Sequence, residues 1–386
     1  MQEYAEQMNP ADRRGRRLIA GVRLTHRPTK NVHEETTMKD YKQGLKVCLC
    51  VVSVFAFLGS ACEPGRTEDP LARWKEQPNQ SIVFVSKADS PEGELYLLDK
   101  NGRTSRITNN NRLENNPALS PDGRKVAFHA GNIEDPLTWD IYVIDLETKE
   151  ETRLTNNNVL DGHPDWSPDG SKIVFASFRD ADGNPAGTAD IYVMNIDGTG
   201  LKQLTHSSWE DNDPEWSPDG TKIVFKSTRH TQQSAREEIY IMDADGGNVQ
   251  RLTTTSGWQS DHDPSWSPDG KTIVFSRYAG NRPWTDIYDP DVLKDFWQEI
   301  IPWDIYRVDL GGIVAKLTEV DYAAGLPVFS VDGSKILFLR LDFILINRKL
   351  AGADHRLILM DPDGTGREQL IPDDRHTPTL EYFDWR

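Results

Sequence analysis

The sequence predicts an all-β fold of six four-stranded units in a ring, a six-bladed β-propeller that its own C-terminal strand closes. A 15-residue string of the type DNDPEWSPDGTKIVF occurs at five places, and successive copies lie 47 to 63 residues apart. A period of this length indicates repeated supersecondary units that stack or form a ring. Two further strings follow each copy, so each unit has sequence enough for the four strands of a propeller blade.

The first two strands of a unit flank a turn of the type S-P-D-G. In the copy at residues 211–225 this turn is at 217–220, where Pro fixes one φ angle and Gly tolerates a positive φ at another position. Residues 222–226 then alternate and are rich in β-branched side chains, which is typical of a half-buried strand. The turn serines of the five copies are Ser120, Ser167, Ser217, Ser267 and Ser330.

The third strand is a string of the type D-I-Y-V-M, and the fourth is a short string of the type R-L-T. In the same unit these are residues 238–243 and 250–253, joined by a Gly-rich turn at 245–247. Each of the two strings occurs six times along the chain. The Asp and Gly residues of the turns could also suggest calcium loops, but the ligand series of an EF-hand is absent, so turn formation is the preferred interpretation.

The two ends of the repeat array complement each other. The first unit has its second, third and fourth strands, at residues 82–85, 95–98 and 106–108, but nothing of the first-strand type precedes them. The last residues, 381–385, read EYFDW and look like that missing strand. The C-terminus is therefore expected to supply the innermost strand of the first blade, which removes the exposed edges of an open array.

The strings P-x-W-S-P-D-G, K-I-V-F, D-I-Y-V-M and R-L-T resemble the WD40-like (PD40) repeats of the TolB family, over about residues 81–386. The resemblance implies a TolB-like propeller and a bacterial cell-envelope protein with protein partners. Fewer than 20 residues separate Cys62 from the first strand, so the amino-terminal α/β domain of TolB has no room in this part of the chain.

The amino-terminal region has the pattern of a signal peptide. An apolar run at 47–58 follows three lysines, precedes the small residues 59–61, and is too short to span a bilayer comfortably. Cys62 after small residues resembles the lipobox of bacterial lipoproteins, although Gly59 stands where Leu is usual; ordinary secretion or a retained anchor are the alternatives. The expected organisation is an extension at 1–37 with Met38 as the true start, a signal peptide at 38–61, a linker at 62–78 after a lipidated Cys62, and a propeller at 79–386.

Composition limits the partners. The only cysteines are Cys48, Cys50 and Cys62, and none follows Cys62 at the expected cleavage site, so no disulfide staples the fold. Without residues 1–61 the chain has 34 Lys and Arg against 55 Asp and Glu, a net charge of about −21. This charge disfavours nucleic acid and anionic membrane surfaces as partners and permits cations, basic protein patches and neutral glycans. Contact with the membrane is expected only through the lipid anchor.

Function is expected on the face where the repeat varies. The turns between strands one and two, and three and four, are uniform, whereas the other connections vary in length. The loops expected between strands two and three are 129–139, 177–189, 227–237, 277–303 and 340–355. The longest is 277–303, in which 291–300 could form a short helix over the mouth of the channel; a tolerated surface insertion is the alternative. Variable loops on a constant scaffold usually carry binding sites, and we call this side the mouth face.

A ring of residues at the start of the innermost strands is expected to surround the channel mouth. The predicted binding residues are Asn116, His163, Asp213, His262, Asp263 and Tyr382. Carboxylates and imidazoles can hold a divalent cation, and the weak candidates for such a metal site are His163, His262, Asp213 and Asp263. Ordinary loop hydrogen bonds and solvated charge are the preferred interpretation, so no cofactor is assigned.

The tryptophans form two groups. Those of the repeat, Trp166, Trp216, Trp266 and Trp385, are expected to pack between blades. Those in the variable connections of the mouth face are Trp139, Trp209, Trp258, Trp284, Trp297 and Trp303. Large aromatic side chains are favoured at interfaces, so this second group is a candidate contact surface for a protein or a sugar.

The sequence favours a non-catalytic, lipid-anchored, periplasmic binding module that docks an envelope protein or peptide on the mouth face, with the outer membrane weakly indicated. One alternative is a metal-dependent polysaccharide lyase of the oligogalacturonate lyase type, for which His163, His206, His262 and Gln259 lie in mouth loops without matching a motif. Another is a lipoprotein that binds neutral glycans through the mouth tryptophans. No catalytic residue is assigned.

Overall fold

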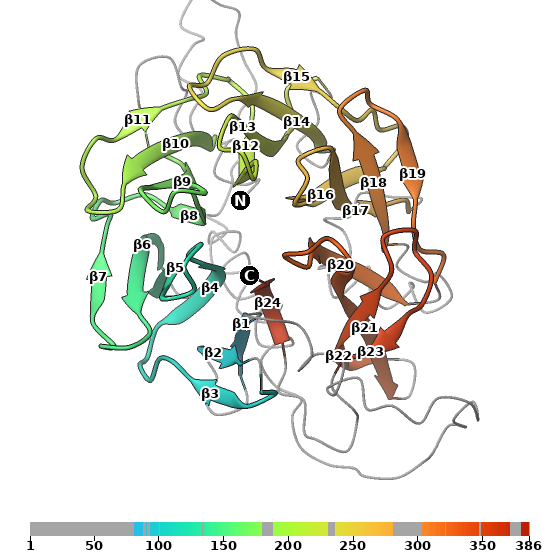
Figure 1. Cartoon of the computed structure of the whole chain (residues 1–386), viewed down its shortest axis with the longest axis horizontal. Helices are drawn as coiled ribbons and strands as arrows, with labels where there is room; N and C mark the ends of the chain where they lie inside the picture. Colours follow the sequence, from blue (N-terminus) through green and yellow to red (C-terminus); the bar gives the residue numbers. More distant parts are fainter. Residues whose placement is uncertain are drawn as a thin grey trace, which may run out of the picture. The chain divides into compact units, whose positions relative to one another are not determined.

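The computed structural model describes residues 81–87, 90, 93–99, 101–132, 135–179, 188–230, 236–280, 303–320, 322–346, 349–370 and 380–385. All of them lie in one compact unit, Val54–Arg386. Their strands form six four-stranded antiparallel sheets around a common axis, with the first strand of each sheet innermost (Figure 1). The predicted six-bladed propeller is confirmed. No helix among these residues is long and apolar enough to cross a membrane.

The strands of each blade follow one another from the innermost to the outermost. Blades 1 to 3 contain β24 (Leu380–Trp385), β1 (Ile82–Ser86), β2 (Glu94–Leu98) and β3 (Thr104–Arg106); β4 (Leu113–Leu119), β5 (Lys125–Asn132), β6 (Asp135–Asp145) and β7 (Glu151–Arg153); β8 (Asp161–Trp166), β9 (Lys172–Ser177), β10 (Asp190–Asn195) and β11 (Lys202–Gln203). Blades 4 to 6 contain β12 (Asp211–Trp216), β13 (Lys222–Ser227), β14 (Glu238–Asp243) and β15 (Gln250–Arg251); β16 (Ser260–Trp266), β17 (Thr272–Tyr278), β18 (Trp303–Asp309) and β19 (Val314–Lys316); β20 (Ala323–Phe329), β21 (Ile336–Ile346), β22 (Lys349–Met360) and β23 (Glu368–Gln369).

The C-terminal strand closes the ring as predicted. β24 pairs antiparallel with β1, with Ile82 opposite Trp385 and Phe84 opposite Phe383. The carboxylate of Asp384 also accepts a hydrogen bond from the backbone N–H of Leu119 in blade 2, at 2.7 Å. The last strand therefore completes blade 1 and joins it to blade 2.

Tryptophans of the repeat pack between blades. Trp166 lies in a buried cluster with residues of blades 2 and 3, and its indole N–H donates to the carbonyl of Ala118 at 3.0 Å. Trp216 occupies the matching place between blades 3 and 4, and Trp266 between blades 4 and 5. The prediction is confirmed for these three, while the side chain of Trp385 lies outside the described part of the chain.

An Asp of the third strand binds a Thr that follows the fourth strand in three of the blades. The buried carboxylate of Asp190 accepts a hydrogen bond from the Thr205 hydroxyl at 2.8 Å, and that hydroxyl also accepts the N–H of Ile191 at 2.9 Å. The same Asp and Thr pair recurs in blades 2 and 5. Since buried polar groups need hydrogen-bond partners, these two repeat positions have a structural role.

The S-P-D-G turns are stabilised by their own side chains. Gly220 has a φ of 71°, which other residues rarely adopt. The Ser167 hydroxyl donates to Asp169 at 2.6 Å, and together with the backbone N–H of Ser171 it lowers the pKa of that carboxyl to about 2. These Asp residues act in turn formation, as expected.

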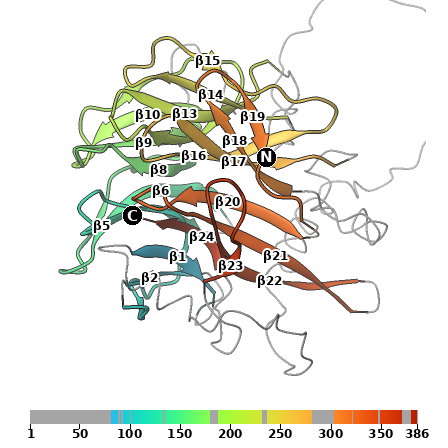
Figure 2. The ribbon, with the colours of Figure 1, turned by 45° about the vertical axis from the view of Figure 1, so that its right-hand side comes forward.

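Two connections predicted as loops contain more strand than expected. Residues 129–139 are largely taken up by β5 and β6, and residues 340–346 and 349–355 form a two-stranded ribbon that runs beyond the ring (Figure 2). In both, the cross-strand pairing of the blade continues into the connection. This pairing satisfies the hydrogen bonds of the backbone N–H and C=O groups, which would otherwise need other partners. The predicted helix at 291–300 and residues 1–78, with Cys62, lie outside the described part.

Candidate functional site

A backbone irregularity places the collar residues around the axis. In five blades the residue before Pro in the first strand has a φ between 44° and 53°, in the left-handed region. The cross-strand register shifts at the same place, as between Asn212 and Glu215, and such a bulge redirects side chains. The five residues are Asn116, His163, Asp213, Asp263 and Leu326. Asn, Asp and His tolerate this conformation best among residues with a Cβ, which accounts for four of the five.

These residues line a cavity of about 140 Å³ on the axis of the ring. Blades 3 to 5 contribute four carboxylates to it, and blade 6 contributes the apolar side chains Leu326 and Val328. The strand β24 contributes the apolar Phe383 and one more carboxylate. The carboxylates are Asp165, Asp213, Glu215, Asp263 and Asp384. Four of the six predicted binding residues line the cavity, His262 lies one residue from it, and the side chain of Tyr382 is outside the described part.

A buried lysine connects the carboxylates of blade 4. The ammonium of Lys226 lies 2.9 Å from Asp213 and 3.3 Å from Glu237. It can also donate to Nδ1 of His262 in blade 5, at 3.3 Å. The side chains of Lys226, Asp213 and Glu237 are all about nine-tenths buried. Lys226 is therefore the centre of an ionic network between two blades.

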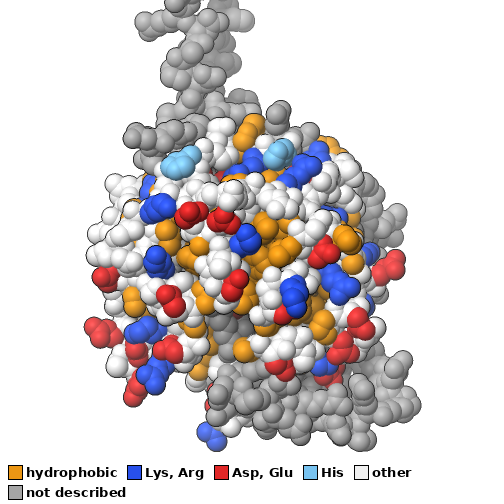
Figure 3. Space-filling model, turned by 45° about the horizontal axis from the view of Figure 1, so that its top comes forward, with side chains coloured by type: hydrophobic (Ala, Val, Ile, Leu, Met, Phe, Trp, Pro, Cys, Tyr) orange, Lys and Arg blue, Asp and Glu red, His pale blue; other side chains and the backbone are white. Residues whose placement is uncertain are grey.

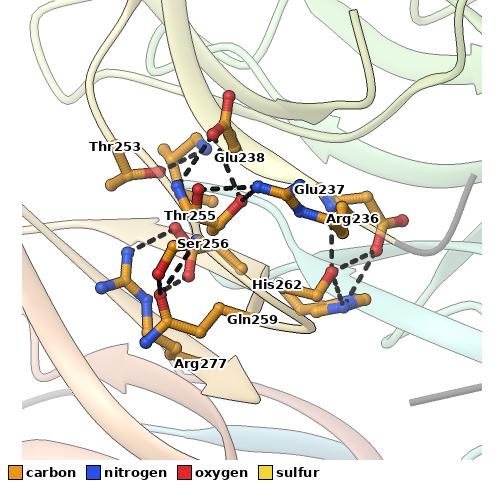
Figure 4. A network of polar contacts seen from close by, with 12 residues as sticks. Arg236, Glu237, Glu238, Thr253, Thr255, Ser256, Gln259, His262 and Arg277 are labelled. Carbon is orange, nitrogen blue, oxygen red and sulfur yellow. Dashed lines mark hydrogen bonds and ion pairs between the residues drawn. The ribbon is translucent and has the colours of Figure 1, made fainter. Parts of the chain in front are cut away.

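Two histidines lie at the ends of this network. Nδ1 of His163, from blade 3, lies 2.5 Å from Asp213. Nε2 of His262 lies 2.9 Å from both Glu237 and the hydroxyl of Ser260, as Figure 4 shows for Glu237 and His262. Together with Lys226 these side chains form one chain of polar contacts over blades 3, 4 and 5. We call the residues His163, Asp213, Lys226, Glu237 and His262 the mouth network.

The charges of the mouth network stabilise one another. Burial opposes ionisation of Glu237, but His262 and Lys226 outweigh it and lower the pKa of the carboxyl to about 2. In the same way His163 and Lys226 hold the pKa of Asp213 below its ordinary value against the effect of burial. The two carboxylates in turn hold the pKa of Lys226 well above its ordinary value, although burial lowers it. All three groups are thus charged at neutral pH.

Next to this network lies a histidine that stays neutral. His129 in blade 2 is buried, and burial together with the neighbouring His163 lowers its pKa well below the ordinary value. Its Nδ1 accepts the backbone N–H of His163 at 3.2 Å, which needs an unprotonated nitrogen. His129 therefore joins blades 2 and 3 without adding charge.

The repeat itself shows that the fold does not need a lysine at this position. Lys226 directly follows the Phe of the second strand that pairs with the third-strand Tyr, and the same position can be identified in every blade from the register. Its occupants, in order of blades, are Val85, His129, Ala176, Lys226, Ser276 and Leu339. Sequence reasoning missed Lys226 and Glu237; the signal was a lysine inside an otherwise apolar strand.

The mouth tryptophans differ in exposure. Trp139 lies against His129 with its ring tilted, at a ring distance of 5.0 Å, and Trp303 lies edge-on to His262 at 4.9 Å. Trp209 and Trp258, in the connections that precede blades 4 and 5, are 36% and 40% exposed. The other two of this group, Trp284 and Trp297, lie outside the described part. Hence two of the four described tryptophans support the walls of the mouth, and two face solvent.

The weak metal candidates are engaged in separate pairs. His163 contacts Asp213, His262 contacts Glu237, and Asp263 accepts a hydrogen bond from Ser276 at 2.8 Å. Within the described ranges there is no group of three or more His, Cys, Asp or Glu that could hold a metal ion. The four weak candidates therefore do not form one group of metal ligands.

The contact between Ser260, His262 and Glu237 has the composition of a nucleophile, a base and an acid, but not the geometry. Both Ser260 and Glu237 contact Nε2 of the imidazole, while Nδ1 faces Lys226. In a catalytic triad the nucleophile and the acid contact opposite nitrogens. Ser260 is also fully buried, so this group is suited to joining strands and not to attack on a substrate.

Comparisons with known proteins agree with this fold. The family model of the TolB β-propeller domain, PD40, matches residues 73–186 and 183–292. A search of curated proteins found no match. TolB from Acinetobacter baumannii is similar in structure, with a TM-score of 0.57 and 24% identity over 79% of this chain and 66% of that one. The chain thus spans slightly less than two thirds of that protein.

Two more solved structures are similar. A TolB-type protein from Agrobacterium tumefaciens has a TM-score of 0.52 and 20% identity, over 76% of this chain and 88% of that one. An oligogalacturonate lyase in complex with manganese has a TM-score of 0.50 and 17% identity, over 77% of this chain and 75% of that one. At such identities the likeness concerns the fold alone.

Proposed function

The chain belongs to the family of the TolB β-propeller domain, PD40, and on this premise we propose that it is a non-catalytic binding module of the bacterial cell envelope. It docks a protein or peptide partner across the mouth face of the propeller. A lipid on Cys62 tethers it to the membrane, and the folded part faces the periplasm. One propeller fold serves many unrelated activities, so the function depends on the residues of the site.

The observation that carries this proposal is the contrast between the two faces. The side chains of the uniform turns bind within their own turns, as Ser217 and Asp219 do at 2.7 Å. The mouth face instead combines the mouth network, an axial cavity with one polar and one apolar side, and the exposed Trp209 and Trp258. Buried polar anchors beside aromatic and apolar surface are typical of protein interfaces.

The mixed distribution of acidic and basic side chains on the surface is consistent with a partner that contacts only a limited patch. Acidic and basic side chains are interspersed over the view in Figure 3, and apolar ones gather near its centre. A surface with mixed charges keeps a protein of high net charge soluble without forming one continuous field. The partner would then be selected by the local chemistry of the mouth.

Site-specific photocrosslinking in living bacteria tests the proposal. A photoreactive amino acid is placed at Trp209 or Trp258 of the full chain, with Ile313 and Val331, exposed beside the uniform turns, as matched controls. We expect discrete protein adducts from the two mouth positions and none from the controls. Adducts that form equally from all four positions, or from the controls alone, would contradict docking on the mouth face.

A second candidate function is binding of neutral glycans, and the exposure of Trp209 and Trp258 favours it. Indole rings stack on apolar faces and keep a polar N–H for hydrogen bonds. Titration of neutral oligosaccharides with Trp fluorescence as the readout separates the two functions. Saturable quenching that Trp258→Ala abolishes would support glycan binding, and no quenching would leave protein docking.

A further inference from the structure

The carboxylates around Lys226 exceed the fixed positive charge that accompanies them. Asp213 and Glu237 share the one ammonium, and each also contacts one imidazole. The carboxylate of Asp263, which also lines the cavity, accepts a hydrogen bond at 2.8 Å from the neutral hydroxyl of Ser276. Burial and the nearby charge of Glu237 raise the pKa of a further carboxyl, Glu210. Negative charge is therefore crowded on the side of the mouth formed by blades 4 and 5.

This arrangement is not a requirement of the repeat. Blades 1, 3 and 6 have Val85, Ala176 and Leu339 at the position of Lys226, and their strands pair in the same way. Buried ion pairs are weak contributors to stability, and apolar replacements are often neutral or stabilising. Charged groups that a fold does not need, next to a cavity, are candidates for ligand contacts.

The geometry points to a site for a cationic side chain of the partner, and we propose that an arginine guanidinium of the docked protein or peptide enters the cavity and contacts Asp263 and Asp213. The inference rests on the proposed docking at the mouth face. A guanidinium binds carboxylates through two donors at once, and its planar, weakly hydrated group suits apolar walls. The walls of this cavity include Pro214, Pro264 and Phe383.

Other ligand classes fit less well. An anion would face the carboxylates Asp165, Asp213, Glu215 and Asp263, and the lining includes only one imidazole, His163. A bare divalent ion needs several oxygen or nitrogen ligands at about 2.0 to 2.6 Å, and the described side chains assemble no such group. A cationic side chain needs only hydrogen-bond distances to two carboxylates. The cavity has room for such a group, being large enough for several water molecules.

The test uses a capped Gly-Ser-Arg-Ser-Gly peptide and a control in which citrulline, an uncharged isostere, replaces the arginine. Binding to the full chain is measured by calorimetry at low salt and neutral pH. We expect the arginine peptide to bind at least about tenfold more tightly, and Asp263→Asn to remove about the same factor. Asn tolerates the positive φ of 51° at this position, so the backbone is kept. A second variant, Glu237→Gln, is expected to weaken binding as well.

Glu147→Gln is the matched control, because Glu147 is an exposed carboxylate in the turn between β6 and β7. Equal binding of the two peptides, or an equal loss in Glu147→Gln, would overturn the inference and indicate unspecific attraction to an acidic protein. If the crosslinks from Trp209 persist unchanged in Asp263→Asn, the result supports docking on the mouth face and contradicts the arginine site. If the arginine peptide binds as expected but the mouth gives no crosslinks, the cation site stands and the docking proposal falls.

Discussion

Replacement of Glu114 by Gln is expected to make the propeller more stable at alkaline pH. Glu114 is fully buried at the start of β4, and its cross-strand neighbour is Ala130. In blade 3 the equivalent Asp161 has Ser177 opposite it and an ion pair with Arg179 at 2.7 Å. Glu114 instead accepts hydrogen bonds from the hydroxyl of Thr108 and from Asn110, and its arginine, Arg112, lies 3.7 Å away.

The magnitude follows from the pKa of this carboxyl. Burial raises the pKa of Glu114 from 4.5 to about 7, because its effect outweighs that of the hydrogen bonds, which lower the pKa. The folded state thus holds the proton more tightly than the unfolded state, so the contribution to stability is complete below pH 4.5 and is lost as the pH rises through 7. At pH 8 the loss is at most about 3 kcal/mol, since one pKa unit corresponds to about 1.4 kcal/mol.

The assay is thermal unfolding of the full chain and of Glu114→Gln between pH 5 and pH 8.5. The variant should gain up to roughly 5 °C in Tm at pH 8 and almost nothing at pH 5. The gain is an upper limit, because the amide nitrogen of Gln replaces one hydrogen-bond acceptor. Asp161→Asn is the matched control and should lose about 3 kcal/mol, because it leaves Arg179 without its buried partner.

The opposite result would refute this reasoning. If Glu114→Gln lowers Tm at pH 8 by as much as Asp161→Asn does, Glu114 is ionised and stabilises the fold as a charge. A Tm of the wild type that does not decline between pH 5 and pH 8 would likewise refute the raised pKa of Glu114.

Three further predictions concern closure, acid stability and metal. Asp384→Ala should destabilise the ring by about 1 to 3 kcal/mol, since the buried N–H of Leu119 loses its acceptor; an unchanged urea midpoint would contradict this. The pKa of Glu237 is lowered from 4.5 to about 2 by His262 and Lys226 against burial, so its contribution is present above pH 4.5 and is lost as the pH falls toward 2; Glu237→Gln should flatten this part of an acid unfolding curve. The purified protein should carry no stoichiometric divalent metal, and chelator should leave its Tm unchanged; one tightly bound ion per chain, lost in His163→Ala, would instead favour a lyase.

The sequence alone was enough to predict the architecture, because the strings of the third and fourth strands each occur six times. The S-P-D-G strings located the hairpins, and the missing first strand at one end matched residues 381–385 at the other, as the pairing of β24 with β1 bears out. Packing of Trp166, Trp216 and Trp266 between blades was also predictable, since each stands at the same place in its unit. Local pattern and tertiary structure agree in such positions.

The candidate site was predictable only in part. The ring of residues before Pro was found because it belongs to the repeat, but its left-handed backbone and the cavity it lines were not. Likewise the sequence predicts a loop where β21 and β22 form a ribbon, because the extension of a ladder depends on register and not on composition.

What the sequence by itself determined is the number of blades, the closure of the ring and the faces on which uniform and variable segments lie, since these follow from periodic strings and chain order. Only the tertiary structure decided which charges meet. Lys226 on β13, Glu237 before β14 and His262 on β16 are up to 36 residues apart, and they come together because neighbouring blades bring their mouth ends side by side. The energy of an ionic contact depends on distance and burial, and neither can be obtained from a sequence until the blades are packed.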